Sequence, residues 1–296
     1  MRILLTGPSG FLGSALVRFW AERGHELTLI ARPSSCLDRL QDLLAAVKVM
    51  RASTPDELAA VVREAMPDAI VHTACSYGRK GESALDVMDA NIRLGVSLLQ
   101  AILERMSLDD TPPTLFLNTG TVLEPRVSLY ALSKSQFSAW GTTLAASTPQ
   151  RLKFIDIRLQ QMYGPGDDDS KFITQVIEAC RQNKPRLALT EGEQLRDFIH
   201  IDDVVQAYDR ILELRDQFAT SDAIDVGSGE AVTIRSFVEM VRQLAGAETV
   251  LDFGAVQYRA NEAMLCAADT ARLRRLGWNP TVPLADGIRQ LINSGR

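Results

Sequence analysis

Short apolar runs recur through the first half of this 296-residue chain, and longer stretches with apolar residues at helical spacing separate them. A strand of a parallel sheet is covered on both faces, so it is expected to be apolar along its whole length. The runs that fit this description are Ile3–Leu5, Glu26–Ile30, Val47–Met50, Ala69–His72, Leu115–Asn118 and Phe154–Arg158. Amphipathic helices are expected between them, notably Ala84–Met106 and Tyr130–Ala146. The alternation predicts an α/β fold built on a doubly wound parallel sheet.

The second half of the chain has a different pattern. Turn residues at Gly164–Gly166 precede an expected helix at Lys171–Gln182, and a further strand is expected at Ala223–Val226. We therefore expect two domains. The larger domain would comprise residues 1–165 with a returning segment near 222–246, and a smaller, discontinuous α/β domain would comprise residues 166–296.

Three glycines spaced three apart follow the first expected strand. Gly7 and Gly10 lie between this strand and an apolar helical segment, Phe11–Arg23, and Gly13 lies in the first turn of that segment. A dinucleotide pyrophosphate needs a tight turn, a close approach of the backbone and a helix whose first N–H groups point at the anion. The pattern therefore predicts a nucleotide-cofactor site. The residues expected to line it here are Gly7, Ser9, Gly10, Phe11, Leu12 and Gly13.

Composition narrows the class of protein. With 46% hydrophobic and 23% charged residues the chain is an ordinary globular protein, and a formal net charge of −5 without a block of Lys or Arg argues against nucleic acid as a partner. No apolar run approaches the length that spans a membrane, and the first strand is too short for a signal sequence. The four cysteines are far apart and there are three histidines, so we expect free thiols, a cytoplasmic location and no metal site.

A tyrosine and a lysine four residues apart supply the second motif. On a helix, Tyr130 and Lys134 share one face, so the phenol and the ammonium can point into the same cleft. A positive charge favours the ionised phenol and lowers its pKa from the usual value of about 10. Such a tyrosine can exchange a proton with a carbonyl or alcohol oxygen while hydride moves at carbon. The hydroxyls of Thr119 and Thr121, at the end of an earlier strand, are candidates for a third group, and we favour Thr119.

These motifs, in this order, resemble those of an extended short-chain dehydrogenase/reductase of the NAD-dependent epimerase/dehydratase family. The resemblance covers nearly the whole chain. It rests on Thr6–Gly13, Ala69–Ala74, Asn91, Tyr130–Lys134, Arg158–Gly166, Arg196–Val204, Val226–Gly229 and Leu276–Pro280. It implies a Rossmann domain that binds NAD or NADP, with Ala74, Asn91 and Lys134 also at the cofactor, and a second domain that binds a nucleotide sugar.

The family's functional residues can be matched one by one. The residues that match its active site are Thr119, Tyr130 and Lys134. Asn91 matches an asparagine that supports this site from behind. Arg196 and Arg259 match arginines that hold the substrate diphosphate, a role that suits the planar guanidinium. The other residues that the resemblance places near the substrate are Thr121, Gln161, Lys171 and Phe172.

Departures from the family pattern narrow the reaction. The family's dehydratases have an Asp-Glu pair after the active-site Ser/Thr, where this chain has Gly120 and Thr121, so sugar 4,6-dehydration is not expected. The loop between Thr119 and Tyr130 is short. This loop and the segment Tyr163–Phe172 resemble those of CDP-abequose and CDP-paratose synthases, which reduce C4 of a CDP-4-keto-3,6-dideoxyhexose with NADPH.

The end of the second expected strand bears on the choice of cofactor. An acidic residue there would bond the 2′-hydroxyl of NAD and repel a 2′-phosphate, but this chain has Arg32 followed by Ser34 and Ser35. Arg32 is therefore expected to bind the 2′-phosphate, so that NADP(H) is preferred over NAD.

The sequence thus predicts a cytoplasmic, NADPH-dependent reductase of the C4 keto group of a nucleotide-linked 4-keto-6-deoxy or 3,6-dideoxyhexose, with CDP as the expected nucleotide. Two alternatives stay open: a nucleotide-sugar 4-epimerase with bound NAD, and a non-catalytic NADP-binding regulator. Family relatives dimerise through the helices that contain Asn91 and Tyr130, so a homodimer is expected. Its apolar face would comprise Leu94, Leu98, Leu99, Phe137 and Trp140, although these side chains could equally pack against the sheet.

Overall fold

A computed structural model describes residues 1–105 and 112–294. The chain divides into two compact units. Unit 1 comprises Met1–Arg158 and Ile211–Ile224, and unit 2 comprises Leu159–Arg210 and Asp225–Arg296. These are units of backbone contact and not of function, so the expected domain boundary at 165/166 stays a prediction.

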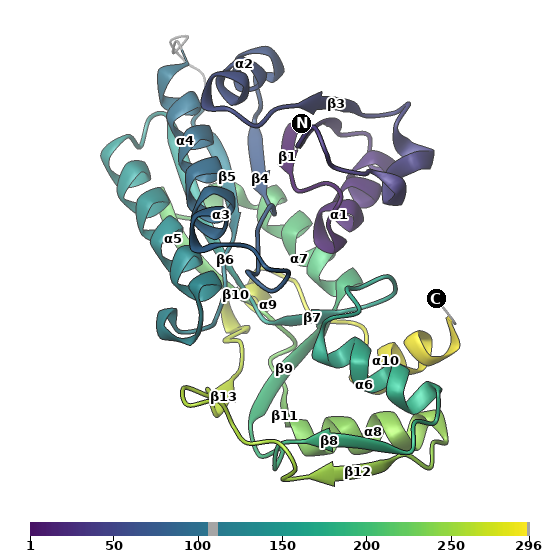
Figure 1. The fold of residues 1–296 in the computed structure, drawn as a ribbon. Helices are drawn as coiled ribbons and strands as arrows, with labels where there is room; N and C mark the ends of the chain where they lie inside the picture. Colours follow the sequence, from purple (N-terminus) through teal and green to yellow (C-terminus); the bar gives the residue numbers. More distant parts are fainter. Residues whose placement is uncertain (106–111, 295–296) are drawn as a thin grey trace. The chain divides into compact units, whose positions relative to one another are not determined.

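Unit 1 is built on a seven-stranded sheet with the order β10-β6-β5-β4-β1-β2-β3 (Figure 1). Its strands are β1 (Arg2–Thr6), β2 (Glu26–Ala31), β3 (Lys48–Arg51), β4 (Ala69–His72), β5 (Thr114–Thr119), β6 (Leu152–Leu159) and β10 (Ser221–Val226). In this order, each strand from β6 to β3 pairs in parallel with its neighbour. The chain passes from β3 at one edge to β4 beside β1, so the strand order reverses between β1 and β4. The predicted doubly wound α/β fold is confirmed, and every predicted strand is present.

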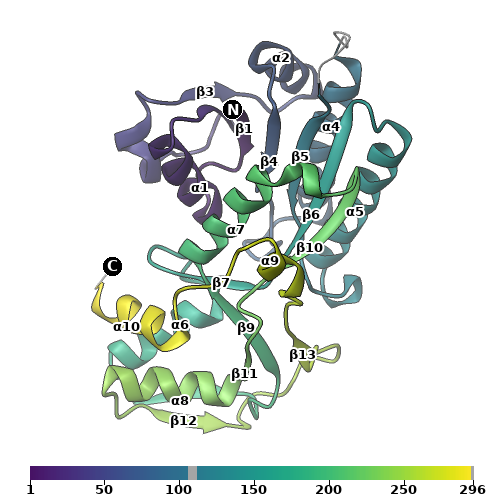
Figure 2. The same ribbon diagram turned by 180° about the vertical axis from the view of Figure 1, so that it is seen from behind.

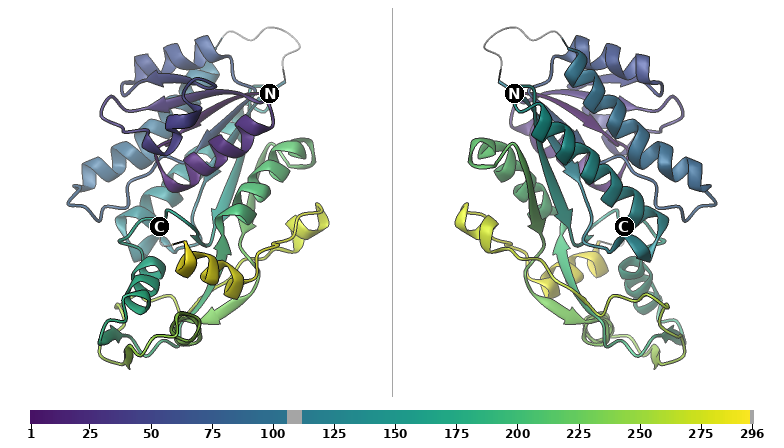
Figure 3. Two further views of the ribbon diagram at one scale, coloured as in Figure 1. Left: turned by 90° about the vertical axis from the view of Figure 1, so that its right-hand side faces the viewer. Right: turned by 90° about the vertical axis from the view of Figure 1, so that its left-hand side faces the viewer.

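Helices cover both faces of this sheet (Figures 2 and 3). On one face lies α1 (Phe11–Glu22), and on the other α2 (Pro55–Ala65), α4 (Leu94–Glu104) and α5 (Leu129–Ser147) lie side by side. The shorter helical segments of unit 1 are η1 (Asp38–Leu43), α3 (Ala84–Met88), η2 (Asp89–Arg93), η3 (Pro125–Val127) and η4 (Arg215–Gln217). Helix α7 (Ile201–Glu213) begins in unit 2 and ends in unit 1. None of the helices in the described part of the chain has the length and apolar character needed to cross a membrane.

The long helix predicted over Ala84–Met106 is interrupted by a wider turn. After α3 the chain forms a π-helical turn, η2, before α4 begins, and Met106 lies outside the described residues. A π-helical turn shifts the side chains that follow it relative to the α-helical register, and such turns are frequent at functional sites. Here η2 contains Asn91, whose side chain is fully buried.

Most of the side chains that the sequence suggests for a dimer face are buried in the core of unit 1. Leu98, Leu99 and Phe137 are buried in the cluster between the sheet and α2, α4 and α5. Leu94 packs against this cluster and is partly buried. Trp140 is different, because 53% of its surface is exposed. The sequence leaves two arrangements open for these side chains, a dimer face or packing against the sheet. Leu98, Leu99 and Phe137 adopt the second.

Unit 2 contains two small sheets and its own core. In one sheet β9 pairs with β11, β13 and β7, and in the other β8 pairs with β12. Its elements are β7 (Gln161–Tyr163), α6 (Phe172–Arg181), β8 (Arg186–Leu189), β9 (Leu195–His200), β11 (Ala231–Thr233), α8 (Ile234–Ala245), β12 (Val250–Phe253), β13 (Leu265–Cys266), α9 (Ala271–Arg275) and α10 (Leu284–Asn293). Phe237 of α8 stacks on Phe198 of β9 with ring centroids 4.4 Å apart. This contact fixes α8 in unit 2, and the returning segment of unit 1 is 211–224.

Candidate active site

The turn after β1 can be formed only by glycines at two of its positions. Gly7 has a φ of +72°, and a Cβ there would lie 2.7 Å from the backbone nitrogen of Ala74. A Cβ on Gly13 would lie 2.1 Å from the carbonyl oxygen of Gly7, which also accepts a 3.0 Å hydrogen bond from the Gly10 N–H. The spacing in the sequence therefore reflects close packing of strand, turn and helix, as a dinucleotide turn requires.

The start of α1 is suited to an anion. Within the described residues, this helix has Gly10 at its N-cap without a side-chain cap and no acidic residue in its first turn. By contrast, α2 is closed by a capping box between Thr54 and Glu57 and also carries Asp56 in its first turn. A helix N-terminus carries a partial positive charge, and without a carboxylate or hydroxyl to satisfy it, α1 can accept the pyrophosphate of a cofactor. The predicted residues from Gly7 to Gly13 fit the group.

The ends of β1 and β4 are tied together beside this turn. Thr6 Oγ1 lies 2.8 Å from His72 Nδ1 and accepts a 3.3 Å hydrogen bond from the Ala74 N–H. The Thr73 hydroxyl donates to the Thr6 carbonyl oxygen at 2.7 Å. His72 is fully buried, and burial together with the positive charge of Lys134 lowers its pKa to about 3. The imidazole is therefore neutral and links the ends of β1 and β4 through Thr6.

The segment after β2 is braced by an arginine that sequence reasoning missed. Arg51, at the end of β3, donates hydrogen bonds of 2.7 Å to the backbone carbonyl oxygens of Arg32 and Ser35. β3 pairs with β2 in parallel with Arg51 opposite Ala31. Arg32 itself is exposed at the position expected for the adenosine ribose. Arg51 thus fixes the backbone of the segment that holds Arg32, where an acidic residue would stand in an NAD-specific site.

The side chain of Lys134, which belongs to α5, reaches the end of β5. This side chain is 1% exposed, and its ammonium donates a 2.7 Å hydrogen bond to the backbone carbonyl oxygen of Thr119. Burial lowers the pKa of Lys134, while the nearby Cys75 and Asp156 act in the opposite direction. Tyr130, one turn earlier on α5, is half-buried. The structure thus brings the predicted lysine to the predicted threonine at the carboxyl edge of the sheet.

Asn91 connects α5 to the loop after β4. Its amide oxygen accepts a 2.7 Å bond from the Ser76 N–H, and its amide nitrogen donates to the Ser76 carbonyl oxygen at 2.9 Å. The same nitrogen donates to Ser133 Oγ at 2.8 Å, and Ser133 Oγ donates to the Tyr130 carbonyl oxygen at 2.9 Å. Asn91 therefore fixes the first turn of α5, and its supporting role at the active site stays a prediction.

A buried carboxylate explains why glycine follows Thr119. Asp156 of β6 is 6% exposed and accepts hydrogen bonds from the Asn118 amide, at 2.6 Å, and from the Ser138 hydroxyl. Burial raises the pKa of Asp156, and these bonds and the charge of Lys134 oppose that rise. A Cβ on Gly120 would lie 2.6 Å from an oxygen of this carboxylate. The first of the two positions that are acidic in the family's dehydratases is thus too close to Asp156 for a side chain.

The predicted substrate residues divide between the units. In unit 1, Thr121 Oγ1 accepts a 3.3 Å bond from the Leu123 N–H. In unit 2, Lys171 forms an ion pair of 2.8 Å with Asp167, and Phe172 begins α6 with 36% of its surface exposed. Gln161 is half-buried on β7. These residues are tied into their own units.

Arg196 binds a glutamate that the sequence did not single out, and the backbone of Arg259 is bonded to the same residue. Arg196 on β9 is 6% exposed, and its guanidinium binds the carboxylate of Glu262 and the carbonyl oxygen of Leu195. The Glu262 N–H donates a 3.0 Å bond to the carbonyl oxygen of exposed Arg259. The two arginines expected at the diphosphate are therefore connected through one loop, but the first is paired with a carboxylate.

The fold, the glycine turn and the Tyr–Lys pair define the class: the chain is an NAD(P)-dependent oxidoreductase of the short-chain dehydrogenase/reductase type. Residues 3–227 match the NAD dependent epimerase/dehydratase family, and the chain belongs to this family. CDP-abequose synthase of Salmonella typhimurium is 29% identical over 98% of this chain and 97% of that protein. dTDP-4-dehydro-6-deoxyglucose reductase of Escherichia coli is 27% identical over 99% and 97%. The fold of UDP-glucose 4-epimerase from Thermotoga maritima superposes with a TM-score of 0.83 at 19% identity, covering 99% of this chain and 97% of that one.

Proposed function

We propose that this enzyme reduces the C4 keto group of a nucleotide-linked 4-keto-6-deoxy or 3,6-dideoxyhexose with NADPH, and that the nucleotide is CDP. The observation that carries the proposal is the bond from the buried Lys134 ammonium to the Thr119 carbonyl oxygen, one helical turn from Tyr130. The likeness to a CDP-abequose synthase over nearly the full length of both chains supports the choice of nucleotide.

The mechanism follows from the roles that these side chains can take. The cofactor, when bound along Gly7–Gly13, supplies a hydride to C4. The Tyr130 phenol donates a proton to the sugar oxygen as the hydride arrives, and the Lys134 ammonium favours loss of that proton from the phenol. The Thr119 hydroxyl donates a hydrogen bond to the same sugar oxygen and orients the carbonyl. With an acidic pair absent after Thr119 in the sequence, the reaction ends at reduction.

NADP(H) is the proposed cofactor because an arginine, and not an acidic residue, stands at the expected 2′-phosphate position. Arg32 is exposed there, and Arg51 braces the segment that carries it. Arginine binds phosphate oxygens in pairs, whereas NAD has only a hydroxyl at this place.

The nucleotide-sugar diphosphate is proposed to bind Arg196 and Arg259. Thr121, Gln161, Lys171 and Phe172 are proposed to contact the nucleotide sugar. The Arg196 guanidinium suits a diphosphate because its planar fork donates two parallel hydrogen bonds.

The test is the loss of NADPH absorbance with CDP-, dTDP-, GDP- and UDP-linked 4-keto-6-deoxy sugars, each generated in place by its dehydratase, and with CDP-4-keto-3,6-dideoxyhexose. We expect consumption with the CDP donors, and Tyr130→Phe should nearly abolish it while sparing NADPH binding. Consumption of NADPH with a donor linked to another nucleotide would mean that the nucleotide is not CDP. Full turnover by Tyr130→Phe would remove Tyr130 from the mechanism.

The alternative of a 4-epimerase makes a different experimental prediction. Such an enzyme keeps NAD bound through a transient oxidation, so NAD⁺ would copurify with the protein and a saturated UDP-hexose would be interconverted without net NADPH use. Saturable NADPH binding without turnover of any donor would instead indicate a regulator on the same fold.

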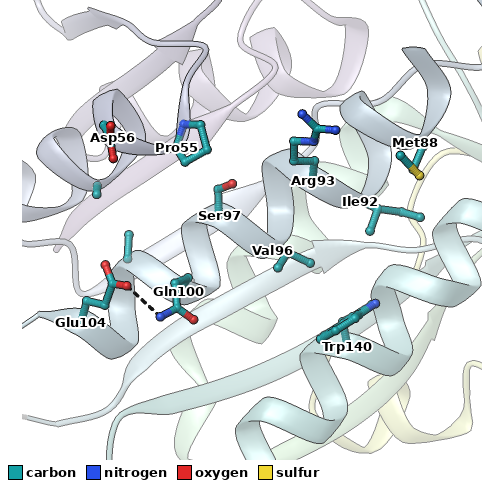
Figure 4. Close-up of a pocket in the computed structure, with 12 residues that line it drawn as sticks. Pro55, Asp56, Met88, Ile92, Arg93, Val96, Ser97, Gln100, Glu104 and Trp140 are labelled. Atoms are coloured by element: carbon teal, nitrogen blue, oxygen red, sulfur yellow. Dashed lines mark hydrogen bonds between the residues drawn. The ribbon is translucent and has the colours of Figure 1, made fainter. Parts of the chain in front are cut away.

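We also propose a cytoplasmic homodimer. A groove runs along α4 between α2 and α5, and the sticks in Figure 4 include Met88, Ile92, Val96 and Trp140 among its lining residues. The exposed Trp140 ring is the largest apolar surface in it. Sedimentation of the wild type and of Trp140→Glu would test this: a monomeric wild type would contradict the proposal.

A further inference from the structure

A second tyrosine lies against Tyr130. The loop after β4 places the Tyr77 ring with its centroid 4.7 Å from that of Tyr130 and with an angle of 31° between the ring planes. The Arg79 guanidinium lies 5.4 Å from the Tyr77 centroid. Tyr77 is 40% exposed. The ring is therefore in contact with the tyrosine proposed to donate the proton, and a cation lies near it.

The backbone of this loop is held by its own hydrogen bonds. Ser76 is bonded on both backbone atoms to Asn91, and its hydroxyl donates to Glu82 at 3.0 Å. The Glu82 carboxylate also accepts from the Lys80 N–H at 2.6 Å. Gly78, with a φ of +64°, donates its N–H to Ser76 Oγ at 3.2 Å. The position of Tyr77 thus depends on the same Asn91 that fixes the first turn of α5.

We propose that Tyr77 is a positioning residue for Tyr130: its ring restricts the rotation of the Tyr130 side chain and holds the phenol oxygen in place for proton transfer. The inference rests on the proposed function of Tyr130 as proton donor. Aromatic pairs with ring centroids at this separation are attractive beyond the area that they bury, and a fixed donor avoids the loss of rate that follows from a small misplacement. The contact needs the ring and not the hydroxyl of Tyr77.

The kinetic test uses Tyr77→Ala and Tyr77→Phe in the full chain, with the sugar donor that the wild type reduces. Tyr77→Ala should lower kcat about 10-fold and change the KM for NADPH little, because the substitution leaves in place the backbone of Ala74, which lies beside the cofactor turn. Tyr77→Phe, which keeps the ring, should restore most of kcat. Leu85→Ala, at a side chain that is 68% exposed on α3, is the matched control. Equal loss in the Phe and Ala variants, or no loss in the Ala variant, would overturn the proposal.

A second measurement needs no substrate and separates this inference from the proposed function. The chain has five tyrosines, so labelling with 3-fluorotyrosine gives five ¹⁹F resonances, and Tyr130→Phe identifies that of Tyr130. Loss of the stacked ring in Tyr77→Ala should shift the Tyr130 resonance and change the pH at which it titrates, whereas Leu85→Ala should do neither. If the Tyr130 resonance is the same in Tyr77→Ala as in the wild type, the positioning role is wrong even where a keto sugar is turned over. If the resonance responds but no sugar is reduced, the contact stands and the proposed function fails.

Discussion

The Lys134 ammonium donates a 2.7 Å hydrogen bond to the backbone carbonyl oxygen of Thr119. Burial lowers the pKa of this ammonium, while the nearby Cys75 and Asp156 act in the opposite direction. The bond also joins α5 to the end of β5, so the lysine that is proposed to act on Tyr130 also fixes the strand that carries the Thr119 hydroxyl.

Replacing Lys134 by Met is therefore expected to damage catalysis more than folding. Methionine fills a similar volume in a buried position, but it supplies neither the charge beside Tyr130 nor the bond to Thr119. We expect kcat to fall by roughly 10²–10⁴-fold, the range usual for loss of acid–base assistance. Steady-state kinetics measures this fall, and the far-UV circular dichroism of the variant controls for folding. A variant with wild-type kcat would show that the ammonium has no part in the reaction.

Cofactor choice can be tested at Arg32. Arg32→Ala should raise the Kd for NADPH by roughly 10- to 100-fold, because a charge-assisted bond to the 2′-phosphate is lost, and should leave the Kd for NADH nearly unchanged. Quenching of NAD(P)H fluorescence gives both constants. Arg23→Ala, at the exposed end of α1, is the matched control for a lost positive charge. Equal weakening of NADH and NADPH binding would mean that Arg32 does not contact the 2′-phosphate.

The Arg196–Glu262 pair makes a prediction about the nucleotide. A carboxylate that already occupies the guanidinium competes with an incoming diphosphate, so Glu262→Gln should tighten the binding of CDP, by roughly 10-fold. The substitution removes one partner of a buried ion pair, and some loss of thermal stability is expected with it. Isothermal titration calorimetry with CDP measures the effect, and Glu239→Gln on the exposed face of α8 is the control. Weaker CDP binding in Glu262→Gln would instead assign the glutamate to the site as a ligand or support of Arg196.

Much of this architecture could be predicted from the sequence because its determinants are local. The strand Ala69–His72 was predicted with the bounds that it has, since a buried parallel strand is apolar throughout. The glycine spacing predicted a turn in which Gly7 and Gly13 leave no space for a side chain.

The features that could not be predicted join segments far apart in the chain. Tyr77 and Tyr130 stack across 53 positions (130 − 77), and Arg196 pairs with Glu262 at a separation of 66. No periodicity within one segment reports such a contact. The π-helical turn at Asn91 was missed for a related reason: apolar spacing fits an unbroken helix, and the interruption is set by the bonds from Asn91 to Ser76 and Ser133.

The lowered pKa of His72 makes the stability of unit 1 depend on pH. Its pKa is about 3 in the folded protein, below the ordinary value of 6.5, because the ring is buried and lies near Lys134. The unfolded chain therefore takes up a proton first as the pH falls, and the folded state loses stability between pH 7 and pH 3. From this group alone the loss between pH 7 and pH 5 is about 2 kcal/mol. His72→Asn, which keeps a polar partner for Thr6 but does not titrate, should be less stable at pH 7 and show a shallower fall towards pH 5. Urea unfolding of the wild type and of His72→Asn at both pH values, followed by far-UV circular dichroism, measures the slope; an unchanged slope in His72→Asn would contradict the buried neutral imidazole.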